Sequence, residues 1–435
     1  MAIEIHDYHV PMTVDDAIYY LQKQTDNFGL FLDLDRLAEY RLRFLLELKE
    51  AETPLKKECP VDKFTQTAIA KYLVEKVGVK PYKVMKDDKV SLDKNIRDAL
   101  IRDADVSEDA RHIVELYNKY YKASYMLSYM TQYLELPICN TPSYNGHRMV
   151  MAHPKWNRLN TGRISASEPS LQNIPKYMGD IITSPEGYVL WRVDSDQIEP
   201  RITYSWYIPD NLIKQIITAY GDAYAGIMHY TEMSDAEEEA CRRDFSNFKK
   251  KEITAEFKEK RKNYKILTLA ANYGSALASV PEDIGRAYKR KIVEHPLRLK
   301  REAEVKQQVA HGTETFFTAF GNPITPQETA KYKKYMQSWK GHVERCGINN
   351  PIQGTASDLM IFSVYEASKV IDKNPNTHIA FYKHDEACFY IKEDEFSKVK
   401  DQLSEITAYN VDGWIPITCE GTEGQLKSEV PSVLC

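Results

Sequence analysis

The sequence predicts an α+β protein in which short strands lie on both sides of a long helical segment. Two observations support this fold class. Residues 188–193 and 378–391 are rich in aromatic and β-branched residues, as strands are. The first third of the chain and residues 211–344 instead show apolar residues at helical spacing. Strands that flank a helical insert are typical of a mixed sheet body with helical attachments.

Composition narrows the class of protein. A chain of 435 residues with 43% apolar residues can bury a sizeable core, and its length favours about three domains of roughly 150 residues. No apolar run is long enough to span a membrane, and the first twenty residues carry no basic side chain, so we expect no signal or transit peptide. Seven scattered cysteines without a C-x-x-C pair favour a reduced intracellular protein without structural zinc.

The net charge of −5 argues against a protein that coats DNA by its overall charge. Two segments are nevertheless strongly basic, namely residues 242–265 and 286–306. Such runs are usually solvated helix faces, but they would also suit a polyanion. Composition alone leaves both interpretations open.

The first third predicts two long amphipathic helices. In residues 33–51, leucine and phenylalanine recur at helical spacing, with Asp33 as the expected N-cap. The second helix spans residues 109–136 and ends before Pro137. Its tyrosines recur every fourth residue, which favours packing over ligand binding.

Four further segments follow along the chain. Residues 161–175 are expected to form a loop because they are rich in Gly, Ser and Pro. A strand at 188–193 follows, with Asp194 directly after it. The C-terminal part, from about residue 349, predicts a helix at 354–371, a hairpin at 378–391, another helix and a closing strand at 414–420.

The hairpin places His384, Asp385 and Glu386 where two apolar strand halves meet. A polar turn would explain these residues equally well. If the strand that ends at Asp194 lies beside the hairpin, however, Asp194 and Asp385 converge and repel unless a cation lies between them. Carboxylates and phosphates are the ligands that Mg²⁺ prefers, and two such ions catalyse phosphoryl transfer.

Two other groups of residues fit the same chemistry. Arg261, Lys265, Leu269 and Tyr273 recur every fourth residue, so they lie along one helical stripe that suits a triphosphate, a sugar and a base. A basic amphipathic surface helix is the alternative. Hydrogen-bond donors from two loops could test base-pair geometry in the minor groove, where all base pairs present similar acceptors; they are Arg163, Asn173, Asn349 and Gln353.

Five segments, taken in order, resemble the motifs of family A DNA polymerases, the group that includes bacterial DNA polymerase one and many phage replicases. They are TGRISASEPSLQNIP, DSDQIEPR, RKNYKILTLAANYG, NNPIQGTASD and KHDE. The resemblance extends from about Gly29 to the C-terminus. It implies a right-hand architecture: a leader at 1–28, a thumb at 29–145, a palm with an antiparallel sheet at 146–205 and 345–435, and helical fingers at 206–344.

The resemblance also implies roles for individual residues. Asp194 and Asp385 would bind the metal ions, Glu386 would be the second carboxylate of its motif, and Lys265 would protonate pyrophosphate. Residues around the nucleotide would be Arg261, Lys265, Leu269, Tyr273, Gln197 and Glu199, of which Glu199 crowds the sugar 2′ position. Contacts to DNA would come from Arg163, Asn173, Asn349, Gln353 and His384.

The implied function is template-directed DNA synthesis with two Mg²⁺ ions, or Mn²⁺ as a substitute. The partners would be primer-template DNA and deoxynucleoside triphosphates. We expect the protein to be a monomer that does not associate with a membrane. We expect it in the cytoplasm of a bacterium or of a phage-infected cell. No proofreading exonuclease is expected in this chain, because nothing matches its D-x-E signature.

The sequence departs from the family pattern at several positions. Leu269 stands where an aromatic residue is usual, Ala270 replaces a glycine, and Tyr224 replaces a histidine that contacts phosphate. Asp196 adds a charge beside the metal site, and the arginine cluster before Pro323 is missing.

Two alternatives compete with this hypothesis. A single-subunit RNA polymerase would share the two aspartates, but Glu199 would obstruct a 2′-hydroxyl and that group has His-Asp-Ser instead of His-Asp-Glu. A catalytically silent DNA-binding accessory protein would have no use for Asp194 and Asp385 together with Arg261 and Lys265.

Overall fold

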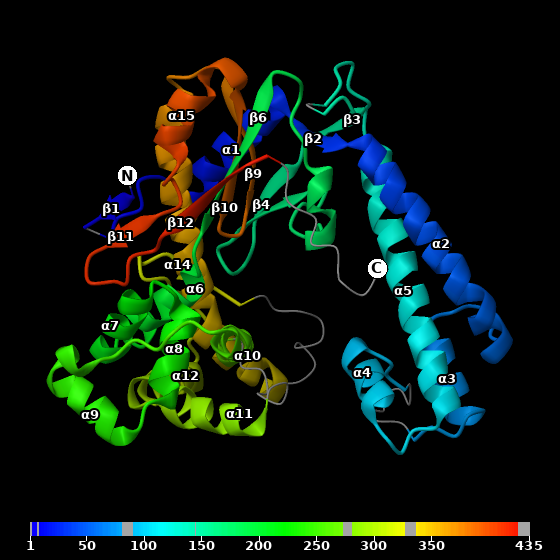
Figure 1. Cartoon of the computed structure of the whole chain (residues 1–435), viewed down its shortest axis with the longest axis horizontal. Helices are drawn as coiled ribbons and strands as arrows, with labels where there is room; N and C mark the ends of the chain where they lie inside the picture. The colour runs from blue at the N-terminus through cyan, green and yellow to red at the C-terminus, as the bar shows by residue number, and fades with distance from the viewer. Residues whose placement is uncertain are drawn as a thin grey trace. The chain divides into compact units, whose positions relative to one another are not determined.

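The computed structural model describes residues 2–6, 8–80, 90–143, 145–272, 281–326 and 336–424 (Figure 1). The chain forms two compact units. The sheet unit comprises Met1–Leu30, His153–Ile174 and Ser184–Gln425, and the long-helix unit comprises Phe31–Ala152 with Pro175–Thr183.

The sheet unit is built on four antiparallel strands in the order β12–β6–β10–β9. Their bounds are Cys419–Glu423, Tyr188–Ser195, Glu386–Lys392 and Thr377–Lys383. The predicted hairpin is therefore confirmed as β9 and β10. Strand β6 lies beside it with Asp194 opposite Glu386, so the expected neighbourhood of the two aspartate motifs is present. The expected α+β class with an antiparallel sheet is confirmed.

Strands β9 and β10 are almost entirely buried because helices cover the sheet. Helix α1 (Val14–Phe28) packs on β9, and α15 (Phe396–Leu403) packs on β6 and β10. The long helix α14 (Met336–Ile371) contacts both of these helices. Three small pairings complete this part: β1 (Ile3–Ile5) with β11 (Tyr409–Val411), β4 (Lys155–Arg158) with β5 (Ile164–Ser167), and β7 (Phe316–Phe317) with β8 (Pro323–Ile324).

Between β6 and α14 the sheet unit is mainly helical. The helices are α6 (Ile198–Ile202), α7 (Asn211–Tyr220), α8 (Ala223–Glu232), α9 (Asp235–Arg243), α10 (Ala255–Asn272), α11 (Glu282–Tyr288) and α12 (Pro296–Ala310). Two π-helical turns, Thr203–Tyr207 and Lys289–Val293, extend α6 and α11, and η3 (Phe245–Asn247) is a 3₁₀ turn. One apolar core joins α7, α8, α10 and α14 through residues such as Ile217, Ile227, Tyr264 and Leu359.

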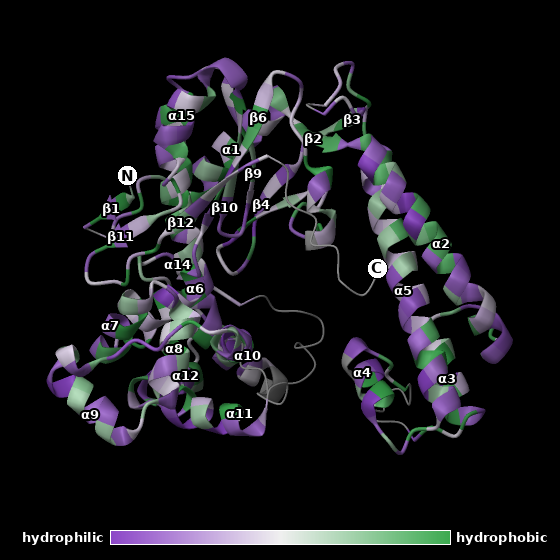
Figure 2. Cartoon of the chain, viewed as in Figure 1, coloured by the Kyte–Doolittle hydropathy of each residue, from purple (hydrophilic) through white to green (hydrophobic). Residues whose placement is uncertain are grey.

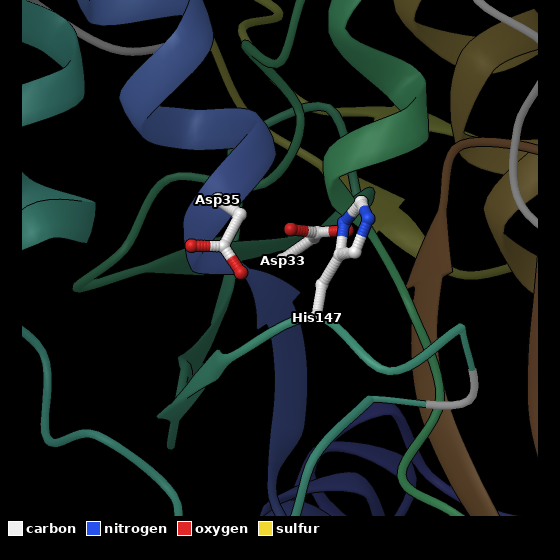
Figure 3. A group of neighbouring side chains, drawn as sticks. All are labelled: Asp33, Asp35 and His147. Atoms are coloured by element: carbon white, nitrogen blue, oxygen red, sulfur yellow. The ribbon is translucent and has the colours of Figure 1, made fainter.

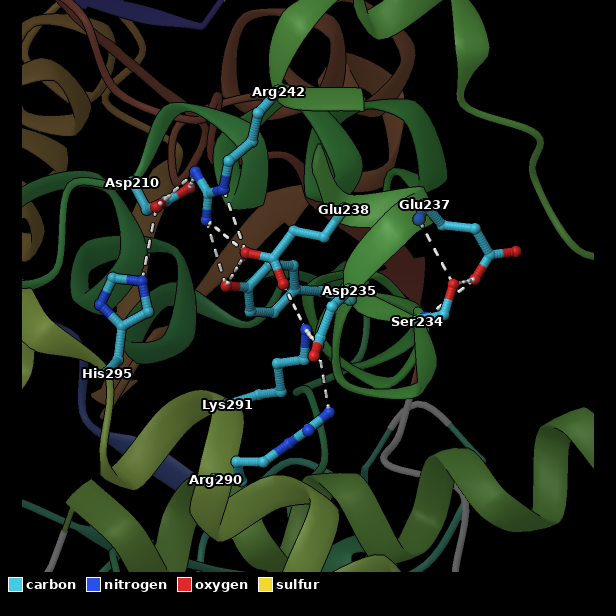
Figure 4. A network of polar contacts seen from close by, with 10 residues as sticks. Asp210, Ser234, Asp235, Glu237, Glu238, Arg242, Arg290, Lys291 and His295 are labelled. Atoms are coloured by element: carbon cyan, nitrogen blue, oxygen red, sulfur yellow. Dashed lines mark hydrogen bonds and ion pairs between the residues drawn. The ribbon is translucent and has the colours of Figure 1, made fainter. Parts of the chain in front are cut away.

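A polar network ties these helices together (Figure 4). Arg242 on α9 pairs with Asp210, which caps α7, at 2.9 Å, and with Glu238 at 2.8 Å. Glu238 also pairs with the buried Lys291. A buried charge is tolerated only when it is paired and hydrogen-bonded, so the buried Lys291 depends on its acidic partners.

The long-helix unit consists mainly of α2 (Leu34–Glu58) and α5 (Glu108–Leu134), which pack side by side. Both show the mixed hydrophobic and hydrophilic colouring of amphipathic helices (Figure 2). The smaller elements are β2 (Leu30–Asp33), α3 (Gln66–Glu75), α4 (Lys94–Arg102), β3 (Met149–Ala152) and η1 (Lys176–Ile181). Both predicted helices are confirmed, and so is the cap, because the Asp33 side chain accepts a hydrogen bond from the Arg36 N–H.

Four local expectations were wrong. Strand β5 lies within the expected loop 161–175, and the β7–β8 hairpin interrupts the expected helical middle. Helix α14 begins at Met336 rather than near residue 354 and continues through Pro351, since buried packing along the helix outweighs one lost backbone hydrogen bond. The closing strand begins only at Cys419, after Pro416, which has no N–H to donate to a ladder.

In the part of the chain that the structure describes, no helix combines the length and the apolar character that a membrane crossing requires.

Candidate active site

Asp194 and Asp385 lie next to each other at one end of the four-stranded sheet. Asp194 is the second-last residue of β6, and Asp385 lies in the tight turn between β9 and β10. The Ser195 N–H donates a hydrogen bond to the Asp385 carbonyl oxygen at 3.0 Å, which fixes the turn against β6. His384 accommodates the turn with a positive φ of 59°.

Burial and neighbouring carboxylates raise the pKa values of both aspartates. Burial raises the pKa of Asp385 to about 6, and the neighbouring Glu199 and Glu386 carboxylates add to this rise while Arg163 opposes it. Crowding by surrounding protein raises the pKa of Asp194 to about 7, with Asp385 and Glu386 contributing repulsion. The Asp194 side chain itself remains solvent-exposed, so water moderates the rise of its pKa. The pair carries negative charge that the protein does not compensate.

Glu386 differs from these two aspartates because it has a cationic partner. It is 8% exposed and forms an ion pair with Arg192, which lies two residues before Asp194 on β6. Asp196, the extra charge of this motif, accepts a hydrogen bond from the Thr418 hydroxyl at 2.8 Å. The uncompensated charge of the site therefore centres on Asp194 and Asp385.

A cavity of about 320 Å³ adjoins Asp385 within the sheet unit. Six of the predicted site residues line it: Arg163, Gln197, Glu199, Leu269, His384 and Asp385. Glu199 is buried and forms an ion pair with Arg163 across this cavity. Gln197 has a positive φ of 54° and accepts a hydrogen bond from the Ala223 N–H at 2.6 Å, which holds α8 against the cavity. Burial and the charges of Arg163 and Lys383 lower the pKa of His384 to about 4, so its imidazole is neutral at pH 7.

The predicted stripe on α10 leads from solvent to this cavity. Lys265 is exposed, Arg261 is partly exposed, and Leu269 reaches the lining. Arg261 is held by Asp222, whose carboxylate lies 2.5 Å from the guanidinium, and its guanidinium lies 5.2 Å from the centre of the Tyr224 ring. Tyr273, the fourth residue of the stripe, lies outside the described residues.

The remaining predicted residues are not among those that line the cavity. Asn173 is exposed and donates a hydrogen bond to the Ser170 hydroxyl at 2.8 Å. Gln353 is buried on α14, and the Asn349 side-chain oxygen is buried without a hydrogen-bond partner among the described residues. The basic runs are largely neutralised within the protein. Lys251 pairs with Glu232, Lys262 with Glu259, Arg290 with Asp235, and Arg298 with Glu302.

Sequence reasoning missed several lining residues. Tyr224 was noted only as a departure from a family pattern, yet it lines the cavity between Glu199 and the cations of α10. Ala356, Ser357 and Met360 line it from α14, and Tyr382 lines it from β9. The spacing of the α14 residues on one helical face, one turn after Gln353, was the available signal.

A second group of ligand-type side chains lies in the long-helix unit (Figure 3). Asp33, Asp35 and His147 place their oxygen and nitrogen atoms within 4.8 Å of one another, and no other such group of three occurs among the described residues. Each already has a partner. His147 Nδ1 lies 2.8 Å from Asp33, which caps α2, and Arg148 pairs with Asp35 at 2.7 Å. These contacts account for the group as structural links between the start of α2 and residues 147–148.

Comparison with known proteins places this geometry in context. A sequence model of DNA polymerase family A matches residues 35–427. DNA polymerase I of Caldicellulosiruptor bescii is 26% identical over 341 residues, which cover 73% of this chain and 37% of that protein. DNA polymerase I of Bacillus subtilis is 22% identical over 92% of this chain and 44% of its own length. The chain thus spans less than half of these curated relatives.

One solved structure has a similar fold. The polymerase domain of Pol1 from M. smegmatis, in complex with a DNA primer-template and dNTP, aligns with a TM-score of 0.73. The alignment covers 95% of this chain and 70% of that chain at 18% sequence identity, so it shows the shared fold.

Proposed function

The chain belongs to DNA polymerase family A, and from this premise we propose that it extends the 3′ end of a DNA primer by copying a template, with release of pyrophosphate. The observation that carries the proposal is the pair Asp194 and Asp385 at one end of the sheet, with Asp385 lining a cavity that Glu199 and Leu269 also line. The similar solved structure holds a primer-template and dNTP, which supports DNA and deoxynucleoside triphosphates as the partners of this chain.

The residues present fit a divalent cation. Asp194 and Asp385 offer hard carboxylate oxygens, and their raised pKa values reflect burial first and then the repulsion of neighbouring carboxylates, which a bound cation would relieve. Two Mg²⁺ ions, or Mn²⁺ in their place, would supply activation of the primer hydroxyl and charge neutralisation at the leaving phosphates. The neighbouring His384 is neutral and Glu386 is paired with Arg192, so neither would add an unpaired charge beside the two aspartates.

The cations of α10 would bind the triphosphate. Arg261 is already oriented by Asp222 and Tyr224. The Lys265 ammonium is exposed, 6.0 Å from the Tyr224 ring centre, and would donate a proton to the leaving group. Glu199 would lie against the sugar, where it takes the space of a 2′-hydroxyl. The Arg163 guanidinium, which pairs with Glu199, would contact the primer terminus from the same cavity.

The finer architectural assignment follows from the same premise. The long-helix unit corresponds to the proposed thumb, the four-stranded sheet to the palm, and the helices between β6 and α14 to the fingers. Asn173, on the loop before the sheet, and Asn349 and Gln353, on α14, would contact the primer-template duplex.

Primer extension tests the proposal. Purified protein, a labelled DNA primer on a template, Mg²⁺ and all four deoxynucleotides should give template-dependent products, whereas ribonucleotides or a template without primer should give none. Asp385→Asn is the matched inactive control, since it keeps the shape of the side chain. Extension only with ribonucleotides would favour an RNA polymerase, and DNA binding without any extension would favour an accessory protein.

A further inference from the structure

Tyr224 borders the part of the active-site cavity in which an incoming nucleotide would lie. It is the second residue of α8, is only 6% exposed, and lines the cavity between Glu199 and the cations of α10. A phenol combines a flat apolar ring with one hydroxyl, which can donate and accept hydrogen bonds. The ring and the hydroxyl can therefore serve two separate purposes at this place.

The ring of Tyr224 contacts the two cations of α10. The Arg261 guanidinium carbon lies 5.2 Å from the ring centre, and the Lys265 ammonium lies 6.0 Å from it. Both distances suit a cation–π contact. Asp222, the N-cap of α8, also accepts a hydrogen bond from the Arg261 Nε at 2.7 Å. The start of α8 thus holds the groups that would bind the triphosphate.

The hydroxyl of Tyr224 has no such commitment, since it forms no hydrogen bond with another residue among those that the structure describes. Burial, followed by the Glu199 carboxylate, raises the pKa of Tyr224, so the phenol keeps its proton at pH 8 and can donate a hydrogen bond. Glu199 and Asp385 both act on this hydroxyl and line the same cavity. The polar end of the ring therefore lies toward the cavity.

Two other hydroxyl groups of the lining already have partners. The Ser357 hydroxyl donates to the Gly162 carbonyl oxygen at 2.6 Å, and the Tyr382 hydroxyl lies 3.2 Å from the Ser363 hydroxyl. Tyr224 instead offers a largely buried donor that a ligand could satisfy. Because an unpaired buried donor costs free energy, a ligand with an acceptor at this point gains affinity over one without it.

The order of the lining residues indicates which part of the nucleotide Tyr224 would meet. Arg261 and Lys265 would bind the phosphates, which leave the sugar at its 5′ carbon, and Glu199 would lie at the 2′ position. Tyr224 lies between these two places. The polar group that a deoxyribose carries between its 2′ carbon and its 5′ phosphates is the 3′-hydroxyl.

We propose that the Tyr224 hydroxyl donates a hydrogen bond to the 3′-hydroxyl oxygen of the incoming deoxynucleotide and thereby selects it over a 2′,3′-dideoxynucleotide. The ring holds the cations for the phosphates, and the hydroxyl tests the sugar. A site that is built to hydrogen-bond a hydroxyl rejects the analogue without it, because the buried donor is then left unpaired. This inference rests on the proposed function, since it assumes that a nucleotide occupies the cavity.

Single-turnover incorporation of a deoxynucleotide and of the matching dideoxynucleotide tests the inference. Tyr224→Phe keeps the ring beside Arg261 and Lys265 and removes only the hydroxyl. Wild-type protein should use the deoxynucleotide at least about fivefold more efficiently, as expected for one neutral hydrogen bond. Tyr224→Phe should lose most of this preference, because it uses the deoxynucleotide less efficiently and keeps its efficiency with the dideoxynucleotide.

Tyr230→Phe is the matched control. Tyr230 lies on the same helix, but its hydroxyl donates to Glu238 at 3.1 Å and it does not line the cavity. This variant should keep the wild-type preference. The inference is overturned if the wild type shows no preference, if Tyr224→Phe keeps the preference, or if Tyr224→Phe loses efficiency equally with both nucleotides.

Nucleotide binding to a dideoxy-terminated primer-template, on which no bond can form, separates this inference from the proposed function. Protein that binds the templated deoxynucleotide more tightly than the dideoxynucleotide through Tyr224, but never extends an unblocked primer, would refute the polymerase activity and leave the sugar contact intact. Protein that extends primers normally, while Tyr224→Phe keeps the wild-type preference in both assays, would refute the sugar contact alone.

Discussion

Replacing Asp385 by asparagine should stabilise the metal-free protein while it abolishes catalysis. The Asp385 side chain lies in the β9–β10 turn, and burial together with Glu199 and Glu386 raises its pKa to about 6 from 3.8. At pH 8 its charge therefore opposes folding. Asparagine has nearly the same shape, and the backbone hydrogen bond from the Ser195 N–H does not depend on the side chain.

The size of the effect follows from the pKa shift. A shift of about two units corresponds to about 3 kcal/mol, and solvent around this partly exposed group reduces the expected gain to about 1–2 kcal/mol. The sign depends on pH. Because the folded pKa is raised, wild-type protein loses this stability as pH rises through 6, so Asp385→Asn should be more stable at pH 8 and equal to wild type at pH 4.

Urea unfolding in EDTA at pH 8 and pH 4 measures the stability, and primer extension with Mg²⁺ measures activity. Mg²⁺ should stabilise the wild type at pH 8 much more than the variant. Nucleotide addition by the variant should fall at least about a hundredfold, since metal-bound charge stabilisation contributes several kcal/mol. The reasoning fails if the variant is less stable than wild type at pH 8 in EDTA, or if it gains as much stability from Mg²⁺.

Three further predictions concern other residues. Glu199→Ala should raise the ratio of ribonucleotide to deoxynucleotide incorporation at least about tenfold, because it opens the cavity at the sugar; an unchanged ratio would place the sugar gate elsewhere. Leu269→Phe should speed single-turnover incorporation of correct deoxynucleotides by giving the sugar a flat wall, and slower incorporation would make Leu269 a packing residue. Lys291→Met should cost about 2 kcal/mol in urea unfolding at pH 7, because Glu238 loses one cation and keeps Arg242 and the Tyr230 hydroxyl. A change below about 0.5 kcal/mol would mean that the network adds little.

Local patterns in the sequence were enough to predict the main elements. The helices α2 and α5, the Asp33 cap and the β9–β10 hairpin depend on periodicity and capping within a few residues, so they are visible without tertiary information. The expectation that Asp194 lies beside the hairpin required one further assumption, namely that β6 pairs with β10. The structure confirms this pairing, because β6 and β10 are antiparallel neighbours with Asp194 opposite Glu386. The errors at β5, α14 and β12 lie where packing overrides local propensity.

The sequence by itself determined which residue types stand in which order, and this order was enough to indicate the family and the two aspartates. Only the tertiary structure decided how their charges are balanced. Arg192 neutralises Glu386, Arg163 pairs with Glu199, and Asp222 holds Arg261. In each pair the partners are between 36 and 194 residues apart along the chain. Coulomb interactions depend on distance in space and on burial, neither of which spacing along the chain specifies, so the choice of partner emerges only when the chain is folded.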